Sequence, residues 1–166
     1  EQNRKVWLAD SFSGSTNPDD ERFPQDKNLN LSDEDFLSIP VEEVRGYLRR
    51  FGLDHDVEFV EGYFEDTMPE LTDGRWSVVR LDGDTYEATR LSLKALYPGL
   101  NKGGYLILVD YSFLPECKQA VDEFREEHGI TEPIETVGWS AARWRKETEA
   151  TTSVGELGRG QGTEGS

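Results

Sequence analysis

Acidic side chains recur at points where the sequence predicts that a buried strand ends. They are Asp10, the pair Asp82 and Asp84, and Asp110. In a parallel sheet the carboxyl ends of the strands lie on one edge, and ligands of open α/β folds bind there. An acid at this edge can bind the two hydroxyls of a cofactor ribose, which is the chemistry we consider for Asp10. Clustered carboxylates suit a hard divalent cation such as Mg2+, which is the chemistry we consider for the other three.

These positions also have a purely structural interpretation, because aspartate favours turns and helix caps in any protein. Position alone gives the two interpretations about equal weight. Carboxylates brought together without a metal repel each other, and one of them tends to stay protonated. A bound cation would remove this repulsion.

The elements that would position these residues alternate along the chain. Apolar runs predict strands at 5–9, 57–61, 76–81 and 105–109, and a terminal strand pair at 134–137 and 141–144. Apolar residues at helical spacing predict helices at 41–51, 86–96 and 115–128. The alternation predicts an α/β fold, with a mostly parallel sheet and helices on both faces.

Two segments lack this pattern. Residues 11–38 are polar and rich in turn formers. Loops of that length in compact domains are usually lids or binding loops, or are disordered. Residues 147–166 are rich in Gly, Thr, Glu and Ser, and we expect a disordered acidic, Gly-rich tail there. Residues 1–146 then form the folded part of the chain.

Composition limits the classes of function. The 18 basic and 34 acidic residues give a net charge of -16, which repels phosphate backbones, so we expect no nucleic-acid binding. The acidity itself indicates solubility or a high-salt habitat, with a basic partner as the alternative. No apolar run approaches the roughly 18 residues of a membrane span. A single cysteine, Cys117, excludes an internal disulfide, and we expect a cytoplasmic protein.

Several segments resemble motifs of the macrocin O-methyltransferase family, in the family's order and spacing. They are Val6–Gly14, Val41–Arg45, Glu61–Pro69 (EGYFEDTMP), Arg80–Thr89 (RLDGDTYEAT), Tyr97–Pro98, Gly103–Tyr105 and Cys117–Arg125. Each motif is weak alone, but the similarity extends from Lys5 to about Arg145. On this resemblance, residues 1–146 are the C-terminal part of a methyltransferase domain.

The resemblance implies a Rossmann-like class I methyltransferase fold, with S-adenosylmethionine as methyl donor and Mg2+ as helper. The implied acceptor is a small molecule, such as a glycosylated natural product or a nucleotide sugar, and a homo-oligomer is compatible with it. Asp10 would bind the cofactor ribose, while Asp82 and Asp110 would hold the metal with Asp84 beside it. The residues implied around the cofactor pocket are Ser11, Phe12, Phe64 and Asp66.

The chain departs from the family pattern at three points. Val109 stands where the family has the first carboxylate of an Asp-Asp-Tyr motif. The loop 11–38 has no histidine in place of the family's catalytic histidine, so the base is unassigned and an Asp or Glu of that loop is the candidate. The family's first strand and Gly-rich cofactor loop are missing, so we expect this chain alone to be less stable than the complete protein or to self-associate.

Three hypotheses follow. The first is an active O-methyltransferase acting on a sugar or another small molecule. The second is a methyltransferase-like protein that is inactive or has another specificity, because of Val109 and the missing histidine. The third is a non-enzymatic α/β binding domain. Metal-dependent turnover would separate the first two, and cofactor binding would separate both from the third.

Overall fold

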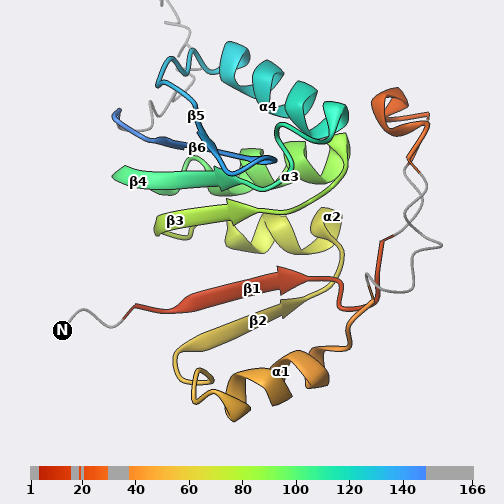
Figure 1. Ribbon diagram of the computed structural model, residues 1–166, viewed down its shortest axis with the longest axis vertical. Helices are drawn as coiled ribbons and strands as arrows, with labels where there is room; N and C mark the ends of the chain where they lie inside the picture. Colours follow the sequence, from red (N-terminus) through yellow and green to blue (C-terminus); the bar gives the residue numbers. More distant parts are fainter. Residues whose placement is uncertain (1–3, 16–18, 20, 30–37, 149–166) are drawn as a thin grey trace, which may run out of the picture.

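The computed structural model describes residues 4–15, 19, 21–29 and 38–148. Its elements are β1 (Val6–Asp10), η1 (Pro24–Asp26), α1 (Val41–Arg50), β2 (Val57–Glu61), α2 (Phe64–Thr67), η3 (Met68–Leu71), β3 (Trp76–Leu81), α3 (Tyr86–Leu96), β4 (Leu100–Leu108), α4 (Pro115–Glu127), β5 (Glu135–Val137) and β6 (Ala141–Arg145) (Figure 1). In these ranges no helix is long and apolar enough to cross a membrane. Nearly all of the predicted tail, residues 149–166, lies outside them.

The strands form two separate sheets. β1 and β2 pair in parallel, with Val6 opposite Val57 and Asp10 opposite Glu61. The larger sheet has the order β3-β4-β6-β5, in which β3 and β4 are parallel and β6 is antiparallel to both of its neighbours. The α/β prediction is confirmed, and the pairing within the larger sheet is mixed. The short turn at 138–140 makes β5 and β6 antiparallel, since parallel strands need a longer crossover.

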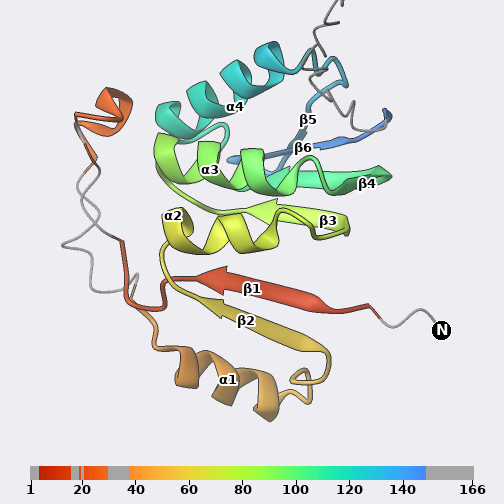
Figure 2. The same cartoon turned by 180° about the vertical axis from the view of Figure 1, so that it is seen from behind.

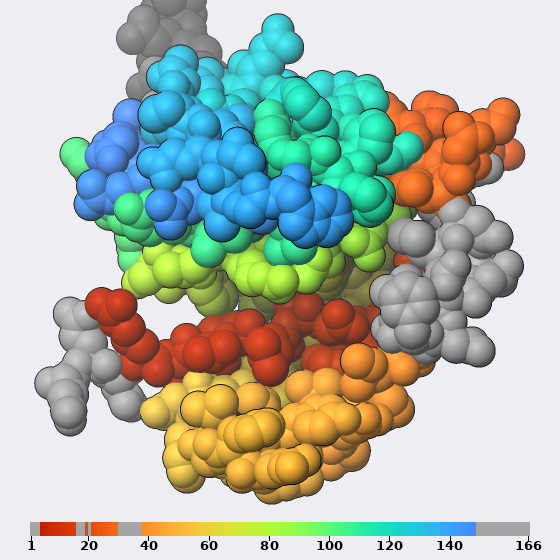
Figure 3. Space-filling view, viewed as in Figure 1, coloured from red at the N-terminus to blue at the C-terminus, as the bar shows by residue number. Residues whose placement is uncertain are grey.

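β1 and β3 face each other without pairing. Both strands run in the same direction (Figure 1), yet within the described ranges no ladder joins them. Trp7 and Trp76 bridge the space, with ring centroids 6.1 Å apart and planes at 84°. Figure 3 shows a furrow between the two sheets on this face. The facing edges of β1 and β3 are thus both unpaired in the described ranges. This agrees with the expectation that a strand of the sheet is missing, and its place would be between them.

The main hydrophobic core lies between the larger sheet and the helices α3 and α4 (Figure 2). Its most buried members are Leu93 of α3, Leu106 and Leu108 of β4, Val121 and Phe124 of α4, and Trp144 of β6. Tyr97 contacts both large rings, with its centroid 5.5 Å from that of Phe124 and 6.1 Å from that of Trp144. Because each such side chain contributes roughly 1.5–3 kcal/mol on burial, this half of the molecule forms a stable frame.

The smaller sheet and α1 lack a comparable core. No residue described in 4–15 or 38–61 is fully buried. Phe51 and Leu53, just after α1, are 68% and 60% exposed. A second, smaller cluster of Met68, Leu71 and Ala95 connects the two halves, and Ala9 and Val60 pack against it. The two sheets are therefore held together mainly through α2, η3 and α3.

The observed strand β4 is longer than predicted, because it begins at Leu100 rather than at residue 105. Two glycines explain the difference. Gly103 has a φ of +81°, and a Cβ on Gly104 would lie 2.8 Å from the carbonyl oxygen of Ser77 on β3. Glycine interrupts the apolar pattern in the sequence, but here it permits the close approach of two strand backbones.

Candidate active site

The ends of β3 and β4 bring three carboxylates together. Asp82, Asp84 and Asp110 each offer one oxygen, and these oxygens lie within 4.8 Å of one another. The two strands are parallel neighbours, with Leu81 opposite Leu108, so their carboxyl ends coincide. The structure thus brings together all three residues that the sequence analysis considered as metal ligands. We call this group the acidic cluster.

Asp82 and Asp84 belong to a tight turn, residues 82–85, which we call the acidic turn. Asp84 has a φ of +56°, a left-handed conformation that aspartate tolerates better than most residues. A Cβ on Gly83 would lie only 3.1 Å from the Ala88 side chain, so a larger residue has little room there. Thr85 ends the turn as the N-cap of α3, and its hydroxyl accepts a hydrogen bond from the Ala88 amide at 3.0 Å.

Burial, with a contribution from nearby carboxylates, disfavours the ionised forms of Asp84 and Asp110. Burial raises the pKa of Asp110 to about 6, and the hydrogen bond with Asp82 and the charge of Asp84 add to the shift. Burial also raises the pKa of Asp84, with a further contribution from the Asp82 charge, while a hydrogen bond with Asp110 opposes it. The Arg80 guanidinium lies 2.8 Å from Asp82 at the surface. It lowers the Asp110 pKa, but its effect is smaller than that of each cause that raises it. Burial and the neighbouring carboxylates therefore outweigh the guanidinium, and a bound cation would favour the ionised forms.

The donor set fits a hard divalent cation. Oδ2 of Asp110 is buried and has no hydrogen-bond partner among the described residues. An unsatisfied buried acceptor costs about 1–3 kcal/mol, and a cation bound to this oxygen would remove that cost. Carboxylate oxygens suit Mg2+ or Mn2+, whereas imidazole and thiolate ligands suit Zn2+ or copper.

A cavity of about 500 Å3 extends from the acidic cluster to the ends of β1 and β2. Its volume falls within the roughly 300–1,000 Å3 that is typical of small-molecule sites. Residues from both sheets line it, among them Asp10, Ser11, Gly62, Tyr63, Phe64, Asp82, Asp84 and Asp110. The cavity therefore places the Asp10 strand end and the acidic cluster around one shared space.

Of the residues assigned to the cofactor pocket, Asp10, Ser11 and Phe64 line this cavity. The Asp10 carboxylate accepts a hydrogen bond from the Phe12 amide at 2.7 Å, which fixes its direction. The ring of Phe12 packs against that of Phe59, with ring centroids 5.9 Å apart, and Phe12 is not part of the cavity wall. Asp66 is exposed on α2 and is not part of the wall either. The cofactor roles of all five residues remain predictions.

Two glutamates of the cavity wall, Glu65 and Glu87, were not predicted from the sequence as site residues. Burial raises the pKa of Glu87, and the charge of Glu65 adds to the shift, while Arg22 opposes it. Glu87 stands inside the RLDGDTYEAT motif, so a signal for it was present. A glutamate in the first turn of a helix also has an ordinary explanation in the helix dipole, and for that reason it did not stand out.

The fold and the site define a class of protein. The structure of the O-methyltransferase NovP matches this chain with a TM-score of 0.84 and 36% identity, over 89% of this chain and 62% of that one. The structure of CalS11, a calicheamicin methyltransferase, shares the fold with a TM-score of 0.61 and 21% identity, over 86% of this chain and 60% of that one. The protein has a class I methyltransferase fold.

The family follows from the sequence. The family model of macrocin-O-methyltransferase (TylF) matches residues 1–146, so the chain belongs to the macrocin O-methyltransferase family. It is 37% identical over 153 residues to the 8-demethyl-8-(2,3-dimethoxy-alpha-L-rhamnosyl)-tetracenomycin-C 4'-O-methyltransferase of Streptomyces olivaceus, covering 91% of this chain and 58% of the relative. It is 38% identical over 149 residues to the mycinamicin III 3''-O-methyltransferase of Micromonospora griseorubida, covering 87% and 58%. The chain thus spans a little over half the length of these relatives.

Proposed function

We propose that the full-length protein is an S-adenosylmethionine-dependent O-methyltransferase that acts on a hydroxyl of a sugar or another small-molecule natural product, with help from a divalent metal. One observation carries the proposal: the acidic cluster, with a buried Asp110 oxygen that has no partner in the described part of the chain, shares a cavity with Asp10. The names of two relatives describe methylation of a glycosylated tetracenomycin and of a mycinamicin. A glycosylated natural product or a nucleotide sugar is therefore the acceptor class that we propose.

The residues of the cavity divide the work. Asp10 accepts hydrogen bonds from the two ribose hydroxyls of the cofactor, with Ser11 and Phe64 beside it. The acidic cluster would hold Mg2+ at the end of the cavity opposite Asp10. When bound, the cofactor supplies a sulfonium methyl group, and Mg2+ lowers the pKa of a chelated hydroxyl. Holding the acceptor oxygen in line with the methyl group removes much of the entropic part of the barrier.

The hydroxyl proton also needs an acceptor, and Glu87 is the candidate. It lines the cavity, and its raised pKa makes it a stronger base than an ordinary glutamate. The loop 11–38 also contains acids, but the carboxylate of Asp26 is buried and bonded to backbone amides, so it is not available as a base. Asp26 is thus excluded, the loop acids at 20 and 33–35 lie outside the described residues, and Glu87 is the base that we propose.

Methyl transfer from labelled S-adenosylmethionine tests the proposal. The full-length protein is offered glycosylated natural products and nucleotide sugars, with Mg2+ and with a chelator. We expect turnover that needs Mg2+ and that Asp110→Asn reduces by about 10²-fold or more, because a metal ligand is lost. Asp73→Asn, a change at an exposed aspartate outside the cavity, is the matched control. Equal turnover in the assays with Mg2+ and with the chelator would contradict the role of the metal.

Val109 favours a second candidate, a methyltransferase-like protein that is inactive or has a different acceptor. Its backbone amide continues the pairing with β3 by donating to the Leu81 carbonyl at 3.0 Å, but its side chain offers no ligand beside Asp110. Cofactor binding without turnover on any acceptor would favour this candidate. The non-enzymatic binding domain would be favoured if the cofactor did not bind either. A cytoplasmic location and a homo-oligomer remain proposals that rest on composition and resemblance.

A further inference from the structure

Asp26 is a fully buried acid in the middle of the long loop between β1 and α1. One of its carboxylate oxygens accepts a hydrogen bond from the Tyr86 amide at 2.6 Å, and the other accepts one from the Glu87 amide at 3.0 Å. A short segment of the loop, residues 21–29, is thereby joined to the first turn of α3. We call this segment the anchored segment.

The hydrogen bonds at the start of α3 show why an acid is needed here. The first four amides of a helix have no partner within the helix. In α3 the amide of the third residue, Ala88, donates to the Thr85 hydroxyl at 3.0 Å, and that of the fourth, Thr89, makes the first bond of the helix ladder, to the Thr85 carbonyl at 3.1 Å. The first two are the amides that Asp26 binds. Without it, two amides that point into the protein would lose their acceptor, at the positive end of the helix dipole.

The same helix start continues directly from the acidic turn. The Thr85 amide donates to the Gly83 carbonyl at 2.5 Å, and Asp84 between them has a left-handed backbone. A residue held in this conformation depends on the structure around it. Fraying of the first turn of α3 would release Thr85 and let the acidic turn relax, which would separate Asp84 from Asp110.

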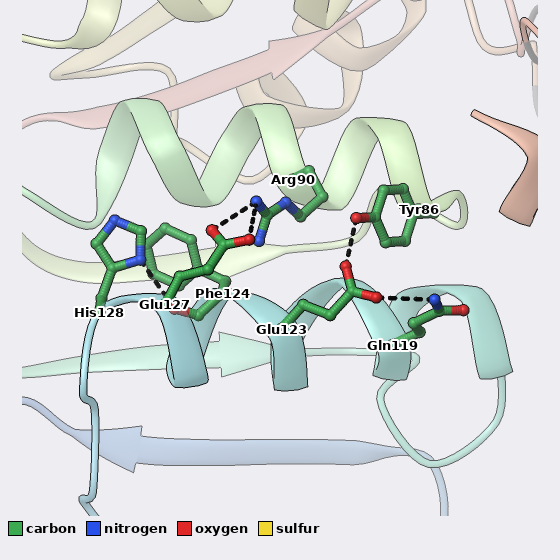
Figure 4. A network of polar contacts seen from close by, with 7 residues as sticks. All are labelled: Tyr86, Arg90, Gln119, Glu123, Phe124, Glu127 and His128. Atoms are coloured by element: carbon green, nitrogen blue, oxygen red, sulfur yellow. Dashed lines mark hydrogen bonds and ion pairs between the residues drawn. The ribbon is translucent and has the colours of Figure 1, made fainter. Parts of the chain in front are cut away.

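Neighbouring contacts give the anchored segment a defined seat on α3. Phe23 packs on Tyr86 with ring centroids 6.2 Å apart, and Arg22 lies 3.9 Å from the Glu87 carboxylate. Tyr86 is held on its other side by α4, because its hydroxyl donates to Glu123 at 2.5 Å (Figure 4). The segment therefore rests on a rigid pair of helices, and Asp26 is the buried contact that fixes it there.

We propose that Asp26 is a positioning residue, which fastens the anchored segment to the start of α3 and thereby keeps the acidic turn in the shape that binds a metal ion. The anchoring stands on the contacts alone, whereas the effect on metal binding rests on the proposed function. Asp26 would act through the acidic turn and would touch neither the metal nor the acceptor.

Two measurements on the full-length protein test the two halves separately. The first is limited trypsin cleavage of the folded protein, with mass spectrometry of the chain breaks after Arg22 and Lys27. The second is calorimetric binding of Mg2+ at a temperature well below the unfolding midpoint. The variants are Asp26→Ala and the nearly isosteric Asp26→Asn. Asp19→Asn is the matched control, because among the described residues the Asp19 carboxylate accepts hydrogen bonds from the amides of Glu21 and Arg22 alone, both in its own loop.

In Asp26→Ala we expect the two breaks to appear about ten- to a hundredfold faster, because two charge-assisted hydrogen bonds are lost and cleavage follows the open population. Asp26→Asn should fall between wild type and Asp26→Ala, and Asp19→Asn should stay near wild type. Mg2+ affinity should fall in the same order. If Asp26→Ala does not fold, the same two measurements on Asp26→Asn and Asp19→Asn still test the anchoring and its effect on metal binding.

The contrary outcomes differ in what they overturn. Unchanged cleavage in both Asp26 variants would overturn the anchoring. Faster cleavage with unchanged Mg2+ affinity would overturn the link to the acidic turn. A wild-type protein that binds no Mg2+ would overturn the metal part of the proposed function, and the cleavage measurement would still decide the anchoring.

Discussion

Asp84 and Asp110 are separated in the chain by the whole of α3 and β4, yet their carboxylate oxygens lie within 4.8 Å of each other. The parallel pairing of β3 with β4 places both at one sheet edge. Burial is the largest cause of the raised pKa of both carboxyls, and the charge of Asp82 adds to the shift in both, as the charge of Asp84 does for Asp110. The group is therefore electrostatically frustrated without a cation, and the first two predictions follow from that.

Removal of one carboxylate should weaken metal binding. We expect Asp110→Asn to lower the Mg2+ affinity of the full-length protein by about tenfold or more, because a charged ligand becomes a neutral one. Isothermal calorimetry measures the change. Glu126→Gln, at an exposed position on α4, is the control and should leave the affinity unchanged. Equal affinities in the two variants would mean that the acidic cluster is not the metal site.

Stability without metal should depend on pH in a direction that the Asp110 pKa fixes. This pKa is raised from 3.8 to about 6 in the folded protein, so between these values the folded state binds more protons than the unfolded state. Stability from this group is therefore fully present below pH 3.8 and falls as the pH rises to about 6. Urea unfolding across this range, with and without Asp110→Asn, measures it. The variant should show a smaller decrease, and an identical pH dependence would contradict the assignment.

The buried Lys146 should be essential to the larger sheet. Its ammonium group donates to the carbonyls of Tyr97 at 2.9 Å and Leu100 at 2.8 Å, and it is only 2% exposed. Lys146→Met keeps the apolar stem but removes the donor, and we expect a loss of about 3 kcal/mol in the free energy of unfolding. Lys102→Met, at an exposed lysine of β4, is the control. A loss below about 1 kcal/mol in urea unfolding would show that the carbonyls find other donors.

The two halves of this chain should differ in local stability. β1, β2 and α1 contain no fully buried described residue, whereas β4 and β6 contribute Leu106 and Trp144 to the main core. We expect amides of β2 to exchange with deuterium much faster than amides of β4. If a further strand pairs with β1 in the full-length protein, the amides of β1 should exchange more slowly there than in this chain alone. Equal protection of β2 and β4 in this chain alone would contradict this uneven distribution of stability.

Much of the frame could be predicted because local pattern and tertiary packing agree. β2, β3 and α3 begin and end at the predicted residues, since apolar runs and helix periodicity match their burial. The three members of the acidic cluster were predictable because β3 and β4 are parallel neighbours that each end in aspartate. The resemblance to the macrocin O-methyltransferase family is confirmed by the family model.

Other features depend on contacts that sequence pattern does not encode. Asp26 stands in a polar segment and looks like an ordinary loop acid, but the structure buries it on a helix start far along the chain. The strand at Gly103 and Gly104 was missed because glycine usually marks a turn, whereas here it permits two backbones to approach. Glu87 lies inside a recognised motif, but its place in the first turn of a helix has an ordinary explanation in the helix dipole, so only the structure shows that it lines the cavity.

The central claim is that Asp10 and the cavity beside it bind the methyl donor. Calorimetric binding of S-adenosylhomocysteine to the full-length protein, to its Asp10→Ala variant and to this chain alone tests it most directly. We expect binding by the full-length protein, at least about tenfold weaker binding by Asp10→Ala because the ribose hydroxyls lose a charged acceptor, and weak or no binding by this chain. If the full-length protein does not bind, or if Asp10→Ala binds as tightly as wild type, the assignment of this cavity to the cofactor is wrong.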